Sequence, residues 1–452
     1  MRGDLMREWL LIGLVIISVP LVLRRPLWGM IIYISATIIR PEMLFWGGTG
    51  GSYVFKVYYM LILAGMFLRH DFKKIGQVAR WEFLLMLWMM GAIFLSEVVA
   101  QYPVFRGSYY VEELLKGFGI CALLYMLIKD FEEIKTVQNV LLGCFAFLSV
   151  WGFDQQLRGN ERLEGLGGGA WGDSNGVAAI FILFLPVALA RAFASKNRRQ
   201  FWTFLGIAAL MVALIVCTKS RAGLLGLVTC LVIFGFCSRI TVKLAQVVLV
   251  LMFAAMPFAT KQYVERMETM SSTGDIENSA SDRITLWKLG LIVFADNPVI
   301  GTGFLTYPEA KMKYEDQFLY LDEEFRNSIF RNESKKVTHN TYIQLLSDCG
   351  LLGAVPFILL VGVGILRGLQ ARRLLSVIPE KNAELICLSG ISAGVSGYAV
   401  CILSIDAVLD IQFYFQLVFA SILYAKIREG AKKESVAVFT SGTSLAAEGA
   451  SS

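Results

Sequence analysis

The sequence predicts an all-α, polytopic membrane protein, a bundle of about 12 transmembrane helices with one large loop that contains helices of its own. Three observations support this fold class. Of the 452 residues, 56% are hydrophobic and 17% are charged, whereas a typical globular chain carries about 25% charged residues. Apolar residues come in blocks of about 16–22, the length at which a helix crosses roughly 30 Å of hydrocarbon. Basic residues gather in alternate connections between these blocks, as in multi-pass proteins.

The first two apolar blocks allow two interpretations. If each crosses the bilayer, the N-terminus lies outside. If the break at Arg24–Pro26 divides one crossing into two pieces, the chain has about 12 spans with both ends inside. The predicted spans are roughly 8–23, 27–39, 53–68, 81–99, 109–128, 136–153, 174–194, 201–217, 222–238, 243–260, 350–367, 383–404 and 407–427.

The formal net charge of +6 reports topology and not a nucleic-acid partner, because the basic residues occupy short connections and do not alternate with aromatic residues. The connections around 47–52 and 101–108 are poor in Lys and Arg, so we expect them outside the cytoplasm. The basic clusters are Arg69, Lys73, Lys74 and Arg80; Lys196, Arg198 and Arg199; Arg239 and Lys243; Arg367, Arg372 and Arg373; and Lys426, Arg428, Lys432 and Lys433.

Two segments interrupt the hydrophobic pattern and define the predicted domains. Residues 1–260 form an N-terminal transmembrane bundle that includes a polar, glycine-rich periplasmic loop at 154–175. Residues 261–340 form a periplasmic helical loop of about 80 residues, and a connection of such length is usually functional. Residues 341–430 form the C-terminal transmembrane helices, and 431–452 form a disordered cytoplasmic tail.

Within the large loop, the segment that follows Ser281-Asp282-Arg283 predicts an amphipathic helix, with Ser281 or Asp282 as its N-cap. Asn297-Pro298 should end that helix, and the glycines of the following G-T-G should turn the chain. The polar segment 311–324 is also predicted to be helical.

The chain contains two histidines. His70 lies between Arg69 and Asp71 in a basic connection, where a solvated surface role is expected. His339 lies where the large loop re-enters the membrane, beside Asn340 and Tyr342. An imidazole at that position could accept a proton near neutral pH, although capping of a helix is the alternative.

Candidate anion-binding groups lie in the same region. Lys219 and Arg221 are separated by one residue between two predicted spans, near the outer membrane surface. Burying such charge is costly, so ionisable groups there are functional candidates, although a lysine can also reach lipid headgroups. The guanidinium of an arginine suits a diphosphate because it donates bidentately and stays charged. Arg283 and Lys288 of the loop helix, and Arg158 and Arg162 of the glycine-rich loop, could complete the pocket.

Four polar residues near the outer ends of spans could orient a sugar or the histidine, or simply cap helices: Asp173, Asn175, Asp406 and Asp410. For Asp173 we expect capping. The eight cysteines lie in or beside apolar blocks without a C-x-x-C pair, so no zinc site or disulfide framework is predicted. The sequence also contains no P-loop, no HExxH motif and no GxSxG nucleophile elbow at a strand-to-helix turn. A group-transfer reaction outside the cytoplasm has no ATP or nucleotide sugar to draw on, so its donor substrate must already carry a good leaving group. A lipid diphosphate is the natural form of such a donor.

The order of four motifs resembles the O-antigen ligase and O-antigen polymerase superfamily, and O-antigen ligases most closely. The motifs are D-S-N opening a span at 173–175, T-K-S-R-A-G at 218–223, D-R-I-T-L-W with N-P-V-I-G-T-G in the large loop, and H-N-T-Y-I-Q-L-L-S-D-C-G-L-L-G at 339–353. In motif form the resemblance covers residues 150–365. Arg40-Pro41-Glu42 is also similar to a segment of exosortase-associated O-glycosylation ligases.

The resemblance implies a GT-C-like inner-membrane glycosyltransferase that needs no metal ion or cofactor and has a periplasmic active site. Such an enzyme takes a glycan from undecaprenyl diphosphate and joins it to a hydroxyl of lipid A–core oligosaccharide, with inversion at the anomeric carbon. The matching positions imply that Arg221 and Arg283 bind the diphosphate and that His339 deprotonates or positions the acceptor hydroxyl. Lys219, Arg158, Arg162, Asp173, Asn175, Lys288, Asn340, Tyr342 and Asp410 are the expected substrate-binding residues.

Three alternatives remain open from the sequence. A polymerase or a protein-glycosylating ligase of the same superfamily differs in its acceptor. An ion-coupled transporter or lipid flippase would use Glu97, Glu112, Glu113 and Lys116 as an internal relay. The sequence shows no inverted repeat that favours a transporter.

Overall fold

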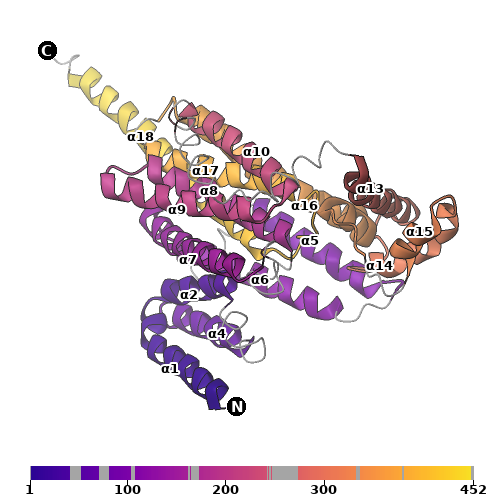
Figure 1. Ribbon diagram of the computed structural model, residues 1–452. Helices are drawn as coiled ribbons and strands as arrows, with labels where there is room; N and C mark the ends of the chain where they lie inside the picture. The colour runs from indigo at the N-terminus through magenta and orange to yellow at the C-terminus, as the bar shows by residue number, and fades with distance from the viewer. Residues whose placement is uncertain are drawn as a thin grey trace.

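The computed structural model describes residues 2–40, 52–70, 81–102, 107–160, 163, 173–241, 243, 246, 273–331, 336–378 and 381–448. These residues form helices and contain no strand (Figure 1). The helices are α1 (Arg2–Arg24), α2 (Pro26–Ile39), α4 (Ser52–Leu68), α5 (Trp81–Val98), α6 (Gly107–Leu127), α7 (Phe131–Leu157), α8 (Ser174–Phe193), α9 (Arg198–Cys217), α10 (Arg221–Ser238), α13 (Thr273–Asp296), α14 (Tyr307–Ala310), η4 (Lys311–Phe318), α15 (Glu323–Phe330), α16 (Thr341–Leu374), α17 (Asn382–Cys401) and α18 (Ile411–Glu448).

The predicted all-helical fold is confirmed for the described residues. Among them, seven helices (α5, α7, α8, α9, α10, α16 and α17) are long and apolar enough to cross a membrane. The count of about 12 crossings stays a prediction, because the shorter apolar helices include α2, whose 14 residues span about 21 Å at 1.5 Å per residue.

Two nearly buried helices, α8 and α17, form the centre of the bundle, and α9, α10 and α16 surround them. Small residues on α17 allow this close packing. A Cβ atom on Gly394 would lie 2.1 Å from the carbonyl oxygen of Leu183, and one on Gly397 would lie 2.6 Å from that of Gly226. The backbones therefore approach as closely as small-residue helix interfaces in membranes allow.

The first two helices pack against each other and against α4, so they lie side by side and do not continue one another. Pro26 opens α2 and Arg25 has a non-helical backbone, which places the turn at the predicted break. At the other end of α2, the carbonyl of Thr37 accepts a hydrogen bond from the side chain of Gln412 at the start of α18. The two N-terminal blocks are therefore separate helices, and whether each of them crosses the membrane stays a prediction.

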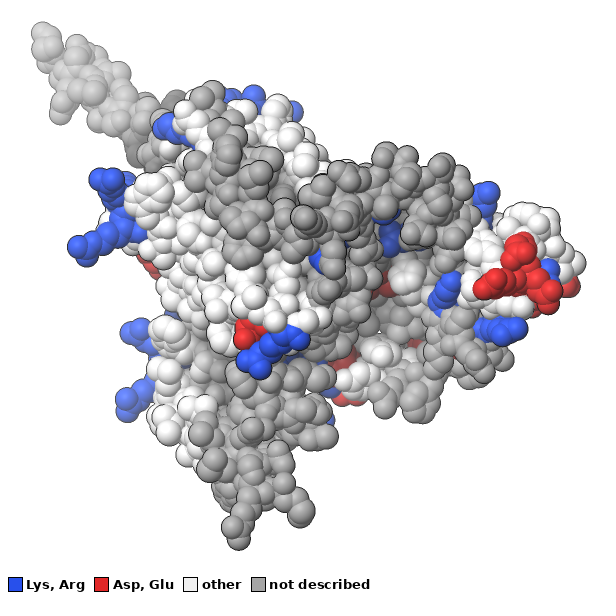
Figure 2. All heavy atoms as spheres, in the orientation of Figure 1, with Lys and Arg blue, Asp and Glu red and all other residues white. Residues whose placement is uncertain are grey.

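The bundle has two chemically different ends. We call the end that carries α13, α14, η4 and α15 the loop end, and the opposite end the basic end. Figure 2 shows Lys and Arg side chains at the basic end with few acidic neighbours, and an acidic cluster together with further Lys and Arg side chains on the lobe formed by η4 and α15. That cluster contains the exposed residues Asp316, Asp322, Glu323 and Glu324.

The lobe at the loop end has a small hydrophobic core of its own. Leu286, Leu289 and Val293 of α13 pack there against Tyr307 of α14 and Phe330 of α15. One face of α13 thus belongs to the lobe, while the neighbouring face is available to the bundle.

The structure differs from three expectations about these elements. The loop helix α13 begins at Thr273 and not at Ser281 or Asp282, although it ends at Asp296 as predicted. Residues 311–324 divide into η4 and the start of α15, around the cap residue Asp322. The backbone of 431–448 continues α18 as helix where the sequence predicts a disordered tail, and its alanine, lysine and glutamate residues are good helix formers.

Candidate active site at the loop end

A break in α16 anchors the large loop to the bundle. Gly350 has φ 60° and ψ −160° inside the helix, which removes regular helical hydrogen bonds from its neighbours. The segment 298–303 replaces them: Thr302 and Gly303 donate their backbone N–H groups to the carbonyls of Ser347 and Asp348. Beyond the break, the N–H groups of Leu351 and Leu352 bond to the carbonyls of Pro298 and Val299. The N-P-V-I-G-T-G and L-S-D-C-G-L-L-G motifs are therefore two halves of one backbone junction.

Glycine is required on both sides of this junction. A Cβ atom at Gly301, where φ is +78°, would lie 2.3 Å from the carbonyl oxygen of Asp348. One at Gly350 would lie 2.4 Å from the carbonyl oxygen of Val299. Both close approaches are to backbone, which cannot rotate away as a side chain can.

Gly301→Ala should destabilise the protein by at least about 1–3 kcal/mol, because alanine would be strained at this φ and would separate the two segments. The measurement is the unfolding midpoint of the purified protein in detergent. Gly362→Ala is the matched control, because a methyl group added to Gly362 of α16 would have no atom within 4 Å. Equal midpoints for the two variants would show that the junction does not contribute to stability.

Asp348, which the sequence analysis did not identify, strengthens the same junction. Its side chain is fully buried and accepts hydrogen bonds from the backbone N–H groups of Leu305, at 3.1 Å, and Tyr307, at 3.0 Å. The carboxylate thus holds the start of α14 against α16. An aspartate inside an otherwise apolar segment of the sequence could have identified Asp348 as a candidate structural or functional residue.

His339 lies immediately before α16 in a backbone that is held on both sides. Its φ is +48°. Thr338 donates its hydroxyl to Oδ1 of Asp406 at 2.9 Å, and the backbone N–H of Asn340 donates to the same oxygen at 3.1 Å. On the other side, the indole N–H of Trp287 donates to the carbonyl of Thr338 at 3.1 Å. These contacts fix the segment that carries the imidazole.

Asp406 is also the electrostatic partner of His339. Burial raises the pKa of Asp406, and the charge of His339 acts in the opposite direction by favouring the carboxylate. Within the described residues, Oδ2 of Asp406 is buried and has no hydrogen-bond partner. The buried carboxyl group of Asp406 therefore lies within electrostatic reach of His339.

The T-K-S-R-A-G and D-S-N motifs form one polar unit at the same end. Ser220 caps α10 by accepting the N–H of Gly223 at 2.9 Å, and its hydroxyl donates to Oδ1 of Asn175 at 2.6 Å. Asp173 caps α8, as expected, by accepting the N–H of Gly176 at 2.6 Å. Arg221 is the first residue of α10, and the turn before it includes Lys219, which is buried and has a φ of +53°.

The turn after α17 joins these two regions. The Cys401 thiol lies 3.5 Å from the carbonyl oxygen of Ala222, next to Arg221. The backbone N–H of Thr341, two residues after His339, donates to the carbonyl of Ile402 at 3.0 Å. The segments that carry Arg221 and His339 therefore flank the same turn, at the same end of the bundle.

The third cationic residue, Arg283, lies on the face of α13 that meets this region. Trp287, one turn later, bonds to Thr338, and a Cβ atom on Gly290 would lie 2.5 Å from the side chain of Ile343. Positions 283, 287 and 290 share one face of a helix. The half-buried Arg283 thus belongs to the face that contacts the His339 segment.

Other predicted substrate-binding residues have mainly structural contacts. Asn340 caps α16, and the Tyr342 hydroxyl donates to the carbonyl of Ala399. Arg158 pairs with Asp154 at 2.7 Å and is 71% exposed. Lys288 is exposed on α13. Arg162 lies outside the described residues, as do Pro41 and Glu42 of the segment resembling the O-glycosylation ligases.

Asp410, in the turn before α18, combines burial with a neighbouring carboxylate. The Tyr398 hydroxyl donates to its Oδ2 at 2.9 Å. Burial raises the pKa of Asp410 to about 7; the Tyr398 hydrogen bond opposes this shift and the Asp173 carboxylate adds to it. Asp410 thus brings the D-S-N unit next to the turn that also carries Asp406.

This pKa predicts a specific pH dependence of stability. Between the ordinary aspartate value of 3.8 and about 7, the folded protein retains a proton that the unfolded chain has released. Stability should therefore fall as pH rises through this window and then level off. Asp410→Asn should lose this fall and exceed the wild type at pH 8 by more than about 1 kcal/mol. Thermal unfolding in detergent between pH 5 and 8 measures the effect, and parallel curves for the two proteins would contradict it.

Lys311 is a buried cation that the sequence analysis also missed. It is 1% exposed, and its Nζ donates to the carbonyl of Lys336 at 2.7 Å. Burial lowers the pKa of Lys311 to about 8, with a further contribution from the charge of Lys336. Through this bond Lys311 ties η4 to the segment that leads into His339.

Residues 206–358 match a family model described as O-antigen ligase. No curated protein matches the chain. The matched residues include Arg221, Arg283 and His339, together with both halves of the α16 junction. The resemblance to the O-antigen ligase and O-antigen polymerase superfamily is thereby confirmed for the domain formed by residues 206–358.

Proposed function

We propose that the protein is an O-antigen ligase, an inverting glycosyltransferase that moves a glycan from undecaprenyl diphosphate to a hydroxyl of lipid A–core oligosaccharide. One observation carries the proposal: the segments of Arg221 and His339 flank a single turn, and Asp406 of that turn lies within electrostatic reach of His339. The match of residues 206–358 to the O-antigen ligase family supports an enzyme of this type.

The orientation follows from the charges of the connections. Basic side chains gather at the basic end (Figure 2), and the positive-inside rule assigns such an end to the cytoplasm. The loop end then faces the periplasm of the bacterial inner membrane. Both substrates are lipid-anchored, so they reach the site within the plane of the outer leaflet.

The reaction is a direct displacement at the anomeric carbon. His339 takes the proton of the acceptor hydroxyl, whose oxygen attacks the anomeric carbon from the face opposite the diphosphate. The bond between that carbon and the diphosphate oxygen breaks, and undecaprenyl diphosphate leaves with the electron pair. Asp406 stabilises the imidazolium that results.

The cationic residues stabilise the negative charge that develops on the leaving diphosphate. Arg221 and Arg283 supply planar, permanently charged guanidinium groups, and Lys219 adds a buried ammonium beside Arg221. Fixed cations in a water-poor site act most strongly where charge appears in the transition state. The family resemblance implies that this chemistry needs no metal ion.

A reconstitution experiment distinguishes an O-antigen ligase from the other enzymes of the same superfamily. The purified protein is mixed with lipid-linked glycan and lipid A–core in proteoliposomes, and the products are identified by mass. Glycan on lipid A–core is the expected result. Longer chains on the lipid carrier would identify a polymerase, and transfer only to an added pilin-like protein would identify a protein-glycosylating ligase.

The transporter alternative has less support from the geometry. Lys116 pairs with Glu112 and Glu113 on the surface of α6, where the three side chains are 31–58% exposed. These three of the four proposed relay residues therefore form an exposed ion-pair network and not an internal one.

A further inference from the structure

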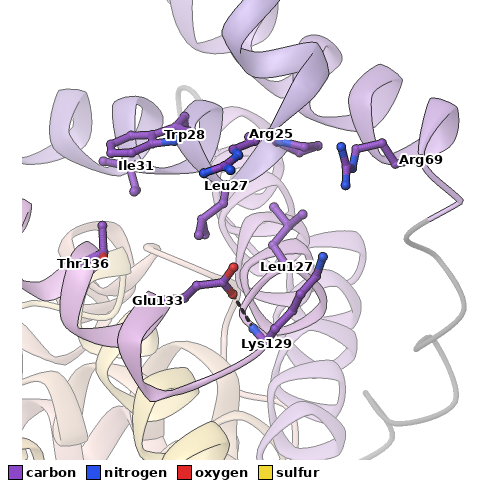
Figure 3. A pocket seen from close by; sticks show the side chains of 10 residues that line it. Arg25, Leu27, Trp28, Ile31, Arg69, Leu127, Lys129, Glu133 and Thr136 are labelled. Carbon is purple, nitrogen blue, oxygen red and sulfur yellow. Dashed lines mark hydrogen bonds between the residues drawn. The ribbon is translucent and has the colours of Figure 1, made fainter.

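A cavity at the basic end is lined by residues between Arg25 and Thr136, and it shares no residue with the candidate active site. Its volume is about 380 Å³. It opens where three helix connections meet: the break between α1 and α2, the end of α4 and the turn between α6 and α7 (Figure 3). The lining residues are Arg25, Pro26, Leu27, Trp28, Ile31, Arg69, Leu127, Lys129, Glu133 and Thr136.

The polar side of this cavity is positively charged. Each of the three connections contributes one cation: Arg25, Arg69 and Lys129. Arg69 donates to the carbonyl of Arg24 at 2.6 Å, which holds its guanidinium at the rim. The carboxylate of Glu133 accepts the backbone N–H of Lys129 at 2.6 Å and offsets one of the three positive charges.

The other side of the cavity is apolar. Its wall is formed by Leu27, Trp28 and Ile31 in the first turns of α2 and by Leu127, the last residue of α6 (Figure 3). These helices run from the cavity into the apolar bundle. The cavity thus combines a cationic rim with an apolar wall, which suits a molecule with an anionic head and a hydrocarbon tail.

We propose that this cavity binds the phosphate group of an anionic phospholipid, with one acyl chain lying against the apolar wall. The three cations lie at helix ends, which is the level of lipid headgroups, and basic pockets between helices on this side of a membrane bind such headgroups. Arginine and lysine donors are the ordinary partners of phosphate oxygens. A free phosphate ion would share the polar contacts but would leave the apolar wall unused.

A bound lipid would also join two parts of the bundle. The cavity has α2 and the end of α4 on one side and the α6–α7 turn on the other. An anionic headgroup in contact with all three cations would reduce their mutual repulsion and hold these parts together. This inference does not depend on the proposed glycosyl transfer.

The test uses Trp28 as a reporter. The full-length protein is placed in nanodiscs that contain phosphatidylglycerol or phosphatidylcholine with brominated acyl chains, which quench tryptophan fluorescence at contact. The signal of Trp28 is the difference between the wild type and Trp28→Phe. Brominated phosphatidylglycerol should quench this difference signal at a much lower fraction of the bilayer than brominated phosphatidylcholine does.

Charge variants at the rim give the decisive comparison. Combining Arg25→Gln, Arg69→Gln and Lys129→Gln should weaken the preference for the anionic lipid on the order of 10- to 100-fold. Glu133→Gln should strengthen it, because it removes the only carboxylate among the described residues that line the cavity. The matched control removes three exposed cations elsewhere at the basic end, Arg198, Arg199 and Arg373, and should keep the preference.

Three results would overturn the proposal. The first is equal quenching of Trp28 by both lipids. The second is an equal loss of preference in the rim and control variants, which would indicate a general surface potential. The third is complete release of the brominated lipid by millimolar inorganic phosphate, which would identify a site for a free anion. Circular dichroism of each variant checks that the helical fold is retained.

Discussion

Replacing His339 should abolish glycan transfer without unfolding the protein. The imidazole is the proton acceptor in the proposed reaction, and loss of general-base catalysis costs about 10²–10⁴-fold in rate. His339 has a φ of +48°, which asparagine tolerates better than alanine does. Both His339→Ala and His339→Asn should therefore be inactive, and the asparagine variant should retain wild-type stability.

His70→Ala is the natural control, because the chain has only one other histidine and this residue lies just after α4 at the basic end. It should transfer glycan at the wild-type rate. The measurement is the initial rate of transfer in proteoliposomes with both lipid-linked substrates. Full activity of His339→Asn would remove His339 from the mechanism.

The partner of His339 extends this prediction. Asp406→Asn keeps the hydrogen bonds that Thr338 and Asn340 can donate to an oxygen, but it removes the negative charge beside the imidazole. It should lower kcat more than it changes KM, since the charge matters when the proton moves. A purely structural role would instead lower the unfolding midpoint and leave kcat of the folded fraction intact.

Arg221→Ala should lose transfer activity by about 10²–10³-fold, the typical cost of removing one group that stabilises developing negative charge. Arg221→Lys should recover part of the loss, because lysine restores the charge but not the bidentate donors. Arg283→Ala should also lower the transfer activity. Initial rates at saturating and limiting donor separate a loss of kcat from a loss of donor binding.

Arg199→Ala provides the matched control, because this exposed arginine at the start of α9 lies at the basic end. It should leave transfer unchanged. If Arg221→Ala turned over normally, the T-K-S-R-A-G turn would have only a structural role, such as the capping of α10 by Ser220.

The sequence predicted the helical class and the order of the polar motifs because both depend on local patterns. Blocks of apolar residues identify helices, and Asp173 and Asn297-Pro298 mark helix boundaries through capping and the restrictions of proline. The position at which α13 begins was not predictable in this way. The helix starts eight residues before the expected cap, because the local capping signal at Ser281 does not outweigh helix formation in the preceding residues.

Contacts between distant segments could not be derived from the sequence. The pairing of 298–303 with the break at Gly350 joins residues about 50 positions apart, and nothing in either motif specifies its partner. The same holds for Lys311 with Lys336 and for Asp348 with the start of α14. The sequence named Asp406 as a possible partner of the histidine but could not choose between that role and helix capping.

The central claim is that Arg221, Arg283 and His339 surround one donor-binding site at the loop end. A donor analogue with a photoreactive group in place of its first sugar, still attached to the lipid diphosphate, tests this directly. After irradiation of the full-length protein, labelled peptides are mapped by mass spectrometry, with natural donor as competitor. The account predicts labels in peptides that contain Arg221, Arg283 or His339, and their loss when the donor is added. Labels confined to the basic end, or unaffected by the donor, would contradict it.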